Sequence, residues 1–329
     1  MKRIIAILLA FLLTSGVLSG CSRTAPNEKK SVICTIFPLY DWVRQILGDK
    51  ADGFDLTLLL DNRIDLHNYQ PSVNDIAKIS SCHLFVYVGG ESDGWVEDAL
   101  KNAANKDMTI INLMATLGNN AKIEEMAEGM QRDHDDDDDD DDDRDDDDDE
   151  HEYDEHVWLS LKNAQIFCTA ITDALSKLDE KNADAYRGNL TGYVNGLSEL
   201  DAKYRAAVDA ATFRTLLFAD RFPFRYTVDD YGIDYYAAFS GCSAETEASF
   251  TTIVFLAQKM DELQLPCVIV TESADQTIAR TVIQNTQTKN YEIRVLDAIQ
   301  SVSSSDVQKG ATYLSIMESN LETLKEALN

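Results

Sequence analysis

The stretch VICTIFPLYDWVRQILGD, residues 32–49, contains the unit from which the fold is built. Its first six residues are apolar and rich in β-branched side chains, which predicts a strand that Pro38 ends. Apolar residues then recur at helical spacing from Tyr40 to Leu47, and Gly48 stops the helix. A strand followed directly by a helix is the repeating unit of parallel α/β sheets.

The same alternation continues on both sides of an acidic run in the middle of the chain. Two long helical stretches, 163–178 and 183–210, follow that run. We therefore expect an α/β protein with two Rossmann-like lobes, each containing a parallel sheet, joined by a long linking helix. The other expected strands and helices are 54–60, 73–79, 83–88, 95–103, 108–113, 215–219, 235–239, 250–263, 267–271, 278–285, 291–296 and 307–328.

The N-terminus predicts export and a lipid anchor. Lys2 and Arg3 precede an apolar core that is too short to span a membrane, and the sequence LSGC then ends in Cys21. This pattern resembles the bacterial lipobox, in which the cysteine is lipidated and holds the protein on the extracytoplasmic face of the cell membrane. The expected organisation is a lipoprotein signal peptide (1–20), a tether (21–30), an N-terminal α/β lobe (31–160) with a disordered acidic loop (132–155), linking helices (161–211) and a C-terminal α/β lobe (212–329).

The charge of the chain is concentrated in one run. The chain has 29 basic and 58 acidic residues, a net charge of −29. The run from Asp133 to His156 contains 19 acids and three histidines, and without it the net charge is −11. A chain this acidic does not bind nucleic acid or an anionic membrane through its charge. The run itself is either a solvated linker or a metal-handling loop, in which His134 and His151 shift the preference from hard cations towards zinc.

Five cysteines remain once Cys21 is lipidated. Because this number is odd, at least one thiol stays unpaired even if a disulfide forms outside the cytoplasm. No CxxC pair is present, which argues against a zinc site built from thiolates. Pairing of Cys34 with Cys82, or of Cys242 with Cys267, stays open at this point; the fifth is Cys168.

Two histidines lie in loops where a ligand site is expected. His67 follows a strand and shares its loop with Asp65 and Pro71, and ligands of open α/β sheets sit beyond the carboxyl ends of strands. A loop histidine can equally be an ordinary surface residue. His156 comes directly after the acidic run and before a helix, so the two imidazoles could meet in one cleft.

Four segments together resemble the signature blocks of zinc/manganese-uptake ABC-importer receptors, the ZnuA-like substrate-binding lipoproteins. They are TIFPLYDWVRQILGDKA (35–51), DLHNYQPSVNDI (65–76), EHVWLSLKNA (155–164) and VTESADQTIARTV (270–282). By this resemblance His67 is the first metal ligand, with Leu66 in place of the usual proline, and His156 is the second. The acidic, histidine-bearing loop lies where zinc-type members carry one.

The remaining two ligands are less regular. The family position of the third ligand falls on Arg221, in ADRFPFRYTVDDYGI (219–233), and a guanidinium has no lone pair for a cation. We expect Asp220 to replace it, with water as the alternative, while Arg221 pairs with a nearby carboxylate. For the fourth ligand, Glu272 resembles the zinc-type pattern and Asp275 lies closer to the manganese-type position. An acid here can equally cap the following helix.

The resemblance implies a monomeric receptor with no catalytic role. It would bind Zn²⁺ in a cleft between the two lobes through His67, His156, Asp220 and Glu272, with Asp275, His134 and His151 as alternates. It would then deliver the metal to the membrane permease of an ABC importer. Mn²⁺ is the alternative cargo, because carboxylate ligands suit harder ions. A zinc-dependent hydrolase is the main rival, although the chain has no HExxH motif and no nucleophile elbow. A metal-dependent adhesin is a second rival.

Overall fold

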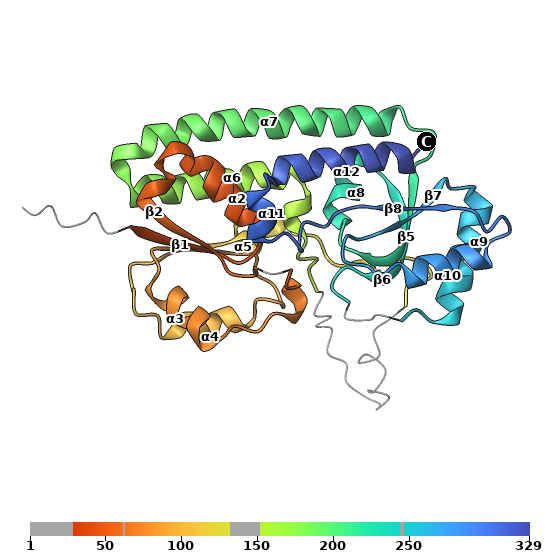
Figure 1. The fold of residues 1–329 in the computed structure, drawn as a ribbon, viewed down its shortest axis with the longest axis horizontal. Coiled ribbons are helices and arrows are strands. Elements are labelled where there is room, and N and C mark those ends of the chain that lie inside the picture. The colour runs from red at the N-terminus through yellow and green to blue at the C-terminus, as the bar shows by residue number, and fades with distance from the viewer. Residues whose placement is uncertain (1–28, 62, 132–151, 244–246) are drawn as a thin grey trace, which may run out of the picture.

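Two four-stranded parallel sheets form the framework of the protein (Figure 1). The computed structural model describes residues 29–61, 63–131, 152–243 and 247–329. The first sheet has the strand order β2-β1-β3-β4, and the second has the order β6-β5-β7-β8. Their paired strands run parallel, as strands joined by crossover helices must. The predicted α/β fold with two lobes is therefore confirmed.

The N-terminal lobe is built on the first sheet and the C-terminal lobe on the second. The N-terminal lobe contains β1 (Lys30–Cys34), α2 (Phe37–Leu47), β2 (Phe54–Leu58), α3 (Val73–Ser81), β3 (Leu84–Tyr87), α4 (Trp95–Lys101), β4 (Thr109–Asn112) and α5 (Leu113–Leu117). The linking helices are α6 (Leu161–Leu178) and α7 (Ala183–Asp209). The C-terminal lobe contains β5 (Thr215–Phe222), α8 (Arg225–Tyr231), β6 (Asp234–Ser240), α9 (Phe250–Leu263), β7 (Cys267–Val270), α10 (Thr277–Asn285), β8 (Glu292–Val295), α11 (Ser304–Gln308) and α12 (Tyr313–Ala327).

The two sheets share one topology although their sequences share no visible repeat. In each sheet the first strand of the lobe lies inside, flanked by the second strand on one side and the third on the other. The strand order therefore reverses between β1 and β3 and again between β5 and β7. Ligands of open α/β sheets bind beyond the carboxyl ends of strands near such a reversal. By this equivalence, β2 corresponds to β6.

Helix α7 runs along both lobes (Figure 1). With 27 residues it is roughly 40 Å long, because each residue of an α-helix adds about 1.5 Å. It packs against α2 and α6 at one end and against α12 at the other. Its buried side chains recur at spacings of three, four and seven, which place them on one face; they include Tyr186, Tyr193, Leu197, Leu200, Tyr204 and Val208.

One apolar core continues from the first lobe into the second. The same buried cluster contains Val32 of β1, Leu216 of β5 and Leu324 of α12. At the junction the Trp42 ring lies 5.2 Å from the Tyr313 ring, and the Tyr313 hydroxyl donates to the carbonyl of Trp158 over 2.6 Å. This shared core resists large hinge movements, because separating the lobes would expose it to water.

Two predicted boundaries differ from the structure for local reasons. The first strand ends at Cys34, before Pro38, and Pro38 is the second residue of α2. A helix tolerates proline in its first turn, because backbone N–H groups there have no intrahelical acceptor and the missing one is not needed. The predicted closing helix 307–328 is two helices, α11 and α12. Gly310, with φ of 101°, separates them, and the Thr312 side chain caps α12.

Residues 152–155, at the C-terminal end of the predicted acidic loop, make defined contacts. Tyr153 forms an antiparallel bridge with Ile123, and the Asp154 N–H donates to the Lys122 carbonyl over 2.9 Å. Asp154 and Glu155 are buried. The rest of the run, with His134 and His151, and the N-terminal segment with Cys21 lie outside the described residues.

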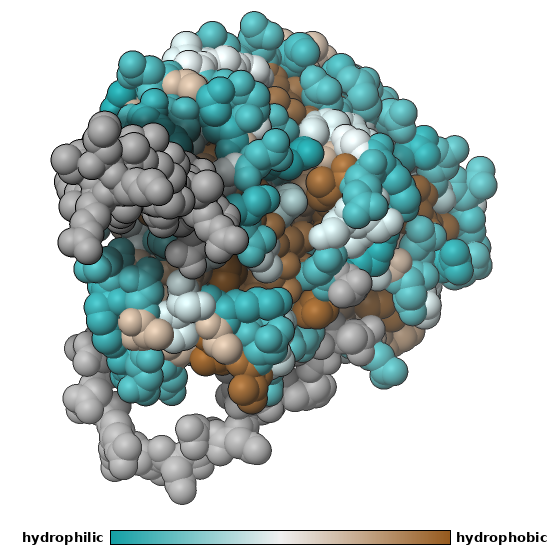
Figure 2. Space-filling view, turned by 60° about the vertical axis from the view of Figure 1, so that its left-hand side comes forward, coloured by the Kyte–Doolittle hydropathy of each residue, from teal (hydrophilic) through white to brown (hydrophobic). Residues whose placement is uncertain are grey.

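Helices in the described part of the chain are either too short or too polar to cross a membrane. The face of the molecule shown in Figure 2 is mainly hydrophilic, and apolar atoms show mostly between and beneath polar side chains.

Asp41 fastens α2 to the start of α12 and is fully buried. Its carboxylate accepts from the Arg44 guanidinium at 2.7 Å and from the Tyr313 N–H at 2.8 Å. We predict that Asp41→Ala lowers the free energy of unfolding by about 3 kcal/mol, because it leaves the Tyr313 N–H buried without an acceptor. Denaturant unfolding followed by circular dichroism measures the loss.

The matched control is Asp49→Ala, which removes an exposed carboxylate paired with Lys50. An exposed ion pair contributes little, so the control should stay within about 0.5 kcal/mol of the wild type. Equal losses in the two variants would show that the Asp41 contacts do not join the helices.

Candidate metal centre

His67 lies in a single 3₁₀ turn, Leu66–Asn68, in the loop after β2. The Asp65 carboxylate caps this turn by accepting from the His67 backbone N–H at 3.1 Å. The ring Nδ1 lies 2.8 Å from the Ser92 hydroxyl and 3.9 Å from a Glu155 carboxylate oxygen. A proton on Nδ1 suits both neighbours, since the Ser92 hydroxyl can accept it and the Glu155 carboxylate attracts it; the neutral ring then has its lone pair on Nε2.

His156 lies directly before the 3₁₀ turn Val157–Leu159, and its ring is fully buried. One oxygen of Asp154 accepts both the His156 backbone N–H, at 2.8 Å, and the ring Nδ1–H, at 3.1 Å. The Trp158 ring lies 5.1 Å away. A proton on Nδ1 satisfies the Asp154 oxygen, and a neutral ring with this tautomer again presents a lone pair on Nε2.

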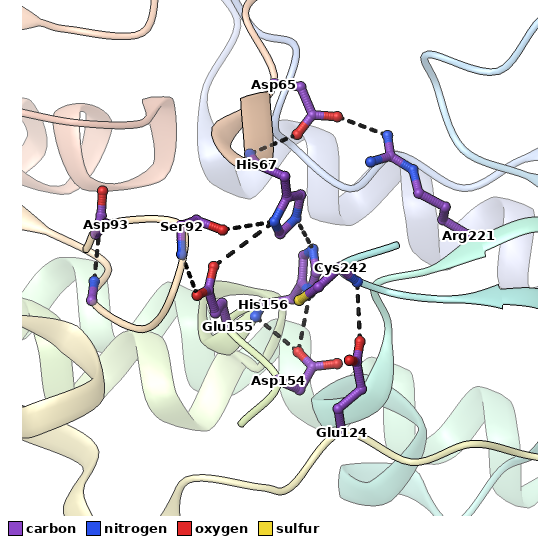
Figure 3. A network of polar contacts seen from close by, with 11 residues as sticks. Asp65, His67, Ser92, Asp93, Glu124, Asp154, Glu155, His156, Arg221 and Cys242 are labelled. Atoms are coloured by element: carbon purple, nitrogen blue, oxygen red, sulfur yellow. Dashed lines mark hydrogen bonds and ion pairs between the residues drawn. The ribbon is translucent and has the colours of Figure 1, made fainter. Parts of the chain in front are cut away.

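The two Nε2 atoms face each other at 3.2 Å (Figure 3). Burial, followed by repulsion from His156, lowers the pKa of His67 to about 3, so this imidazole is neutral near pH 7. With both protons on Nδ1, no hydrogen lies between the two Nε2 lone pairs. A cation at this point would turn their repulsion into two bonds, and deprotonated imidazole nitrogen is a preferred ligand of zinc and other transition metals.

Cys242 completes the cluster, and the sequence reasoning missed it. Its Sγ and the ligand nitrogens of His67 and His156 all lie within 4.8 Å of one another. It follows β6, the strand equivalent to the one before His67, and this position in a strand-end loop was the available signal. The sequence patterns considered for cysteine were disulfide pairs and CxxC motifs, and neither pattern identifies a single cysteine as a metal ligand. The five cysteines in the described residues are free thiols, so neither disulfide considered from the sequence is present.

Acidic groups surround the cluster. A cavity of about 540 Å³ opens over His67 and Cys242 and is lined in part by Glu91, Glu152 and Glu155. One Glu155 oxygen is buried without a hydrogen bond from any described residue. Burial raises the pKa of Glu155, and burial together with nearby acids also raises the pKa of the Cys242 thiol. A cation would offset this concentration of negative charge.

Asp220, the expected third ligand, is directed elsewhere. It lies at a register shift near the end of β5, and its carboxylate accepts from the Thr271 N–H at 2.9 Å and from the Thr271 hydroxyl. It faces a second cavity, of about 310 Å³, together with Asp275. The structure therefore does not bring Asp220 to the two imidazoles.

Glu272, the expected fourth ligand, supports a loop. Its carboxylate accepts from the backbone N–H groups of Ala298, at 2.8 Å, and of Gln300 and Ser301, each at 3.3 Å. The Ala298 carbonyl in turn accepts from the Trp158 indole at 2.8 Å, beside His156. Glu272 is thus linked to His156 through Ala298 and Trp158. The alternate Asp275 is exposed and accepts from the Thr277 N–H at the start of α10.

The predicted pairing of Arg221 with a nearby carboxylate is confirmed. Its guanidinium donates to Asp65 at 2.7 Å, and Figure 3 shows it pointing to the far side of His67 from Cys242. Burial alone would raise the pKa of Asp65, but Arg221 and His67 together outweigh burial and hold that pKa below its usual value. Arg221 belongs to the C-terminal lobe and Asp65 to the loop of His67. The ion pair therefore holds the His67 turn against the opposite lobe.

These features define a class of protein: a two-lobed α/β binding protein with a candidate cation site where the lobes meet. Residues 32–327 match the family described as zinc-uptake complex component A, periplasmic, and the chain belongs to that family.

The sequence is similar to zinc-uptake and zinc-binding proteins over most of its length. The high-affinity zinc uptake system protein ZnuA of Bacillus subtilis is 30% identical over 93% of this chain and 90% of its own length. The zinc-binding protein AdcA of Streptococcus pyogenes is 26% identical over 99% of this chain but only 60% of its own length. The chain thus spans about 60% of the streptococcal relatives.

Two solved structures are similar to the whole fold. The metal-dependent lipoprotein YcdH from Bacillus subtilis superimposes with a TM-score of 0.72 and 26% identity, over 92% of this chain and 100% of the other. The Zn(II)-bound AdcA from Streptococcus pneumoniae has a TM-score of 0.70 and 25% identity, over 91% of this chain and 58% of the other.

The two acids that turn away from the imidazoles give a test of their roles. We predict that Asp220→Ala and Glu272→Ala each lower the free energy of unfolding of the metal-free protein by about 2 kcal/mol, because each strands backbone N–H groups. Denaturant unfolding in the presence of a chelator measures this. A carboxylate that served only as a metal ligand would cost the metal-free protein stability, so its removal would have no effect or a stabilising one.

Asp275→Ala is the control, since it removes an exposed carboxylate that bonds one N–H. Its loss should be below about 1 kcal/mol, the usual contribution of a helix cap. If neither Asp220→Ala nor Glu272→Ala differs from this control, their backbone bonds do not explain why they are held away from the cluster.

Proposed function

We propose that this protein is an extracytoplasmic receptor that binds zinc where its two lobes meet and delivers it to the permease of an ABC importer. His67 and His156 are two of its ligands. The protein binds and releases its cargo unchanged and carries out no reaction. It works as a monomer, held at the membrane by a lipid on Cys21.

The observation that carries this proposal is the pair of Nε2 atoms 3.2 Å apart. A buried pair of lone pairs is unfavourable unless something positive lies between or beside them. Asp154 and Ser92 contact Nδ1 of the two rings, on the side away from the facing Nε2 atoms, as the hydrogen-bond partners of histidine ligands do at metal sites. The arrangement is therefore prepared for a cation before the cation arrives.

Zinc is the preferred cargo for two reasons. Imidazole ligands suit zinc better than manganese, which favours sites rich in carboxylate and water. The two carboxylates that would have supplied the harder ligands, Asp220 and Glu272, are bound to backbone and hydroxyl groups instead. Relatives named for zinc uptake or zinc binding support the same choice.

Capture needs little movement of the lobes. The continuous core and α7 hold the lobes together, while the His67 turn and the Cys242 loop lie at the edge of the open cavity. Release to a permease can then follow from displacement of these loops, which lie outside the core and cost less to move than a whole lobe.

Replacing the less buried member of the imidazole pair, His67, tests the site. We predict that His67→Ala weakens zinc binding by at least about 100-fold, because one of the two imidazole ligands is lost while the groups that oriented it remain without a ring to hold. Competition with a chromophoric zinc chelator measures the affinity, and the same titration with manganese gives the selectivity.

His83→Ala is the matched control. The His83 ring is hydrogen-bonded to Ser31 of β1 and does not belong to the cluster. It should bind zinc as tightly as the wild type. Unchanged affinity in His67→Ala, or tighter binding of manganese than of zinc by the wild type, would overturn the proposed site or its cargo.

Delivery is tested in cells. Cells without this protein should grow slowly when a chelator depletes zinc, and either added zinc or the wild-type protein should restore growth. The His67→Ala protein should fail to restore it, whereas His83→Ala should succeed. Rescue by manganese but not by zinc would contradict the proposal.

A further inference from the structure

The C-terminal lobe brings one ligand atom to the described cluster. His67 and His156 both come from the chain before α6. The polar groups at the carboxyl ends of the central strands of the second lobe are engaged elsewhere: Asp220 with Thr271, and Arg221 with Asp65. The Cys242 thiol is the group from that lobe that lies within 4.8 Å of both imidazole nitrogens.

The loop that carries Cys242 is built to lie against His156. Gly241 precedes it, and a Cβ atom there would lie 3.0 Å from the His156 ring and 2.8 Å from the Phe222 carbonyl. The Cys242 N–H donates to a Glu124 oxygen at 3.0 Å (Figure 3). Glu124 is itself tied by its N–H to the Glu152 carbonyl, four residues before His156. The close approach at Gly241 and the hydrogen bond to Glu124 therefore both fix the backbone that carries the thiol.

The position of Cys242 also differs from that of the other cysteines. Cys34, Cys82, Cys168 and Cys267 are at most 6% exposed and belong to the packed interior, as ordinary buried cysteines do. Cys242 lines the cavity beside His67. It follows β6, whereas His67 follows the equivalent strand β2, so the two lobes offer a ligand from matching loops.

We propose that the Cys242 thiolate is the third zinc ligand, supplied by the C-terminal lobe in place of an imidazole or a carboxylate. This rests on the proposed function and specifies its site as two nitrogens and one sulfur. When the metal–sulfur bond forms, the thiol proton passes to solvent. A thiolate favours zinc and other soft or borderline ions over manganese and magnesium, so Cys242 sets the selectivity of the receptor as well as its affinity.

Cobalt(II) is the probe for sulfur ligation, because it replaces zinc and a cobalt–thiolate bond has a charge-transfer absorption in the near ultraviolet. The purified wild-type protein titrated with cobalt should show this band together with the visible ligand-field bands. Cys242→Ser should keep ligand-field bands but lose the charge-transfer band. Cys267→Ala, which removes a thiol from β7 of the same lobe, should keep both.

Affinity gives a second readout. Cys242→Ser should bind zinc about 10- to 100-fold more weakly than the wild type, and its preference for zinc over manganese should fall. Circular dichroism and the unfolding midpoint of each variant establish that it is folded. A third measurement needs no variant: zinc should protect Cys242 of the native wild type from alkylation by iodoacetamide, as read by mass spectrometry.

The outcomes separate the two proposals. Two results would contradict the sulfur ligand but not the proposed receptor. One is that the wild-type protein binds zinc and cobalt without a charge-transfer band, and the other is that Cys242→Ser binds zinc as tightly as the wild type. Wild-type protein that binds neither metal overturns the receptor and this proposal with it.

Discussion

Two imidazoles that present lone pairs to each other at 3.2 Å are the constraint around which the rest of the site is arranged. Such a pair persists only if both rings are held from behind. Asp154 holds His156 through its ring and its backbone, while Ser92 and Asp65 hold the ring and the backbone of His67. Ser92 and Asp154 contact the ring nitrogen that faces away from the other imidazole. The facing nitrogens are thereby left free for a metal, as they are where hydrogen-bond partners orient histidine ligands.

The electrostatics of the site follow from the same constraint. Asp154 and Glu155 are almost fully buried, and burial together with Glu155 raises the pKa of Asp93 to about 7, although the Gly89 N–H opposes this. Buried carboxylates near one another are unfavourable unless positive charge compensates them. Arg221 compensates Asp65, but the region around Glu155 has no comparable basic partner among the contacts that the structure describes. A divalent cation would supply the missing positive charge. Without it, the buried carboxylates lower the stability of the fold, which is the cost of a site arranged in advance for a cation.

The way the lobes are joined decides how such a site can open. The apolar core is continuous, α7 packs on both lobes, and Asp41 ties α2 to α12 across the junction. Rigid lobes leave the loops after β2 and β6 as the parts that can move at low cost. The ion pair of Arg221 with Asp65 then has a clear physical role, because it couples the His67 turn to a strand of the opposite lobe.

The sequence by itself determined the two α/β lobes, the long linking helices and the meeting of His67 and His156. Strand and helix periodicity reports local burial, which is why 250–263 coincides with α9 and 183–210 with α7 to within one residue. Motif spacing identified the two imidazoles, although they lie 89 residues apart. Tertiary structure alone decided the rest of the site. Asp220 and Glu272 have suitable chemistry for a metal, but backbone N–H groups from neighbouring strands and loops compete for their oxygens. Cys242 reaches the cluster because Gly241 lets its loop pass against His156. Such competition and close approach arise between segments far apart in the chain, and no local pattern of residues records them.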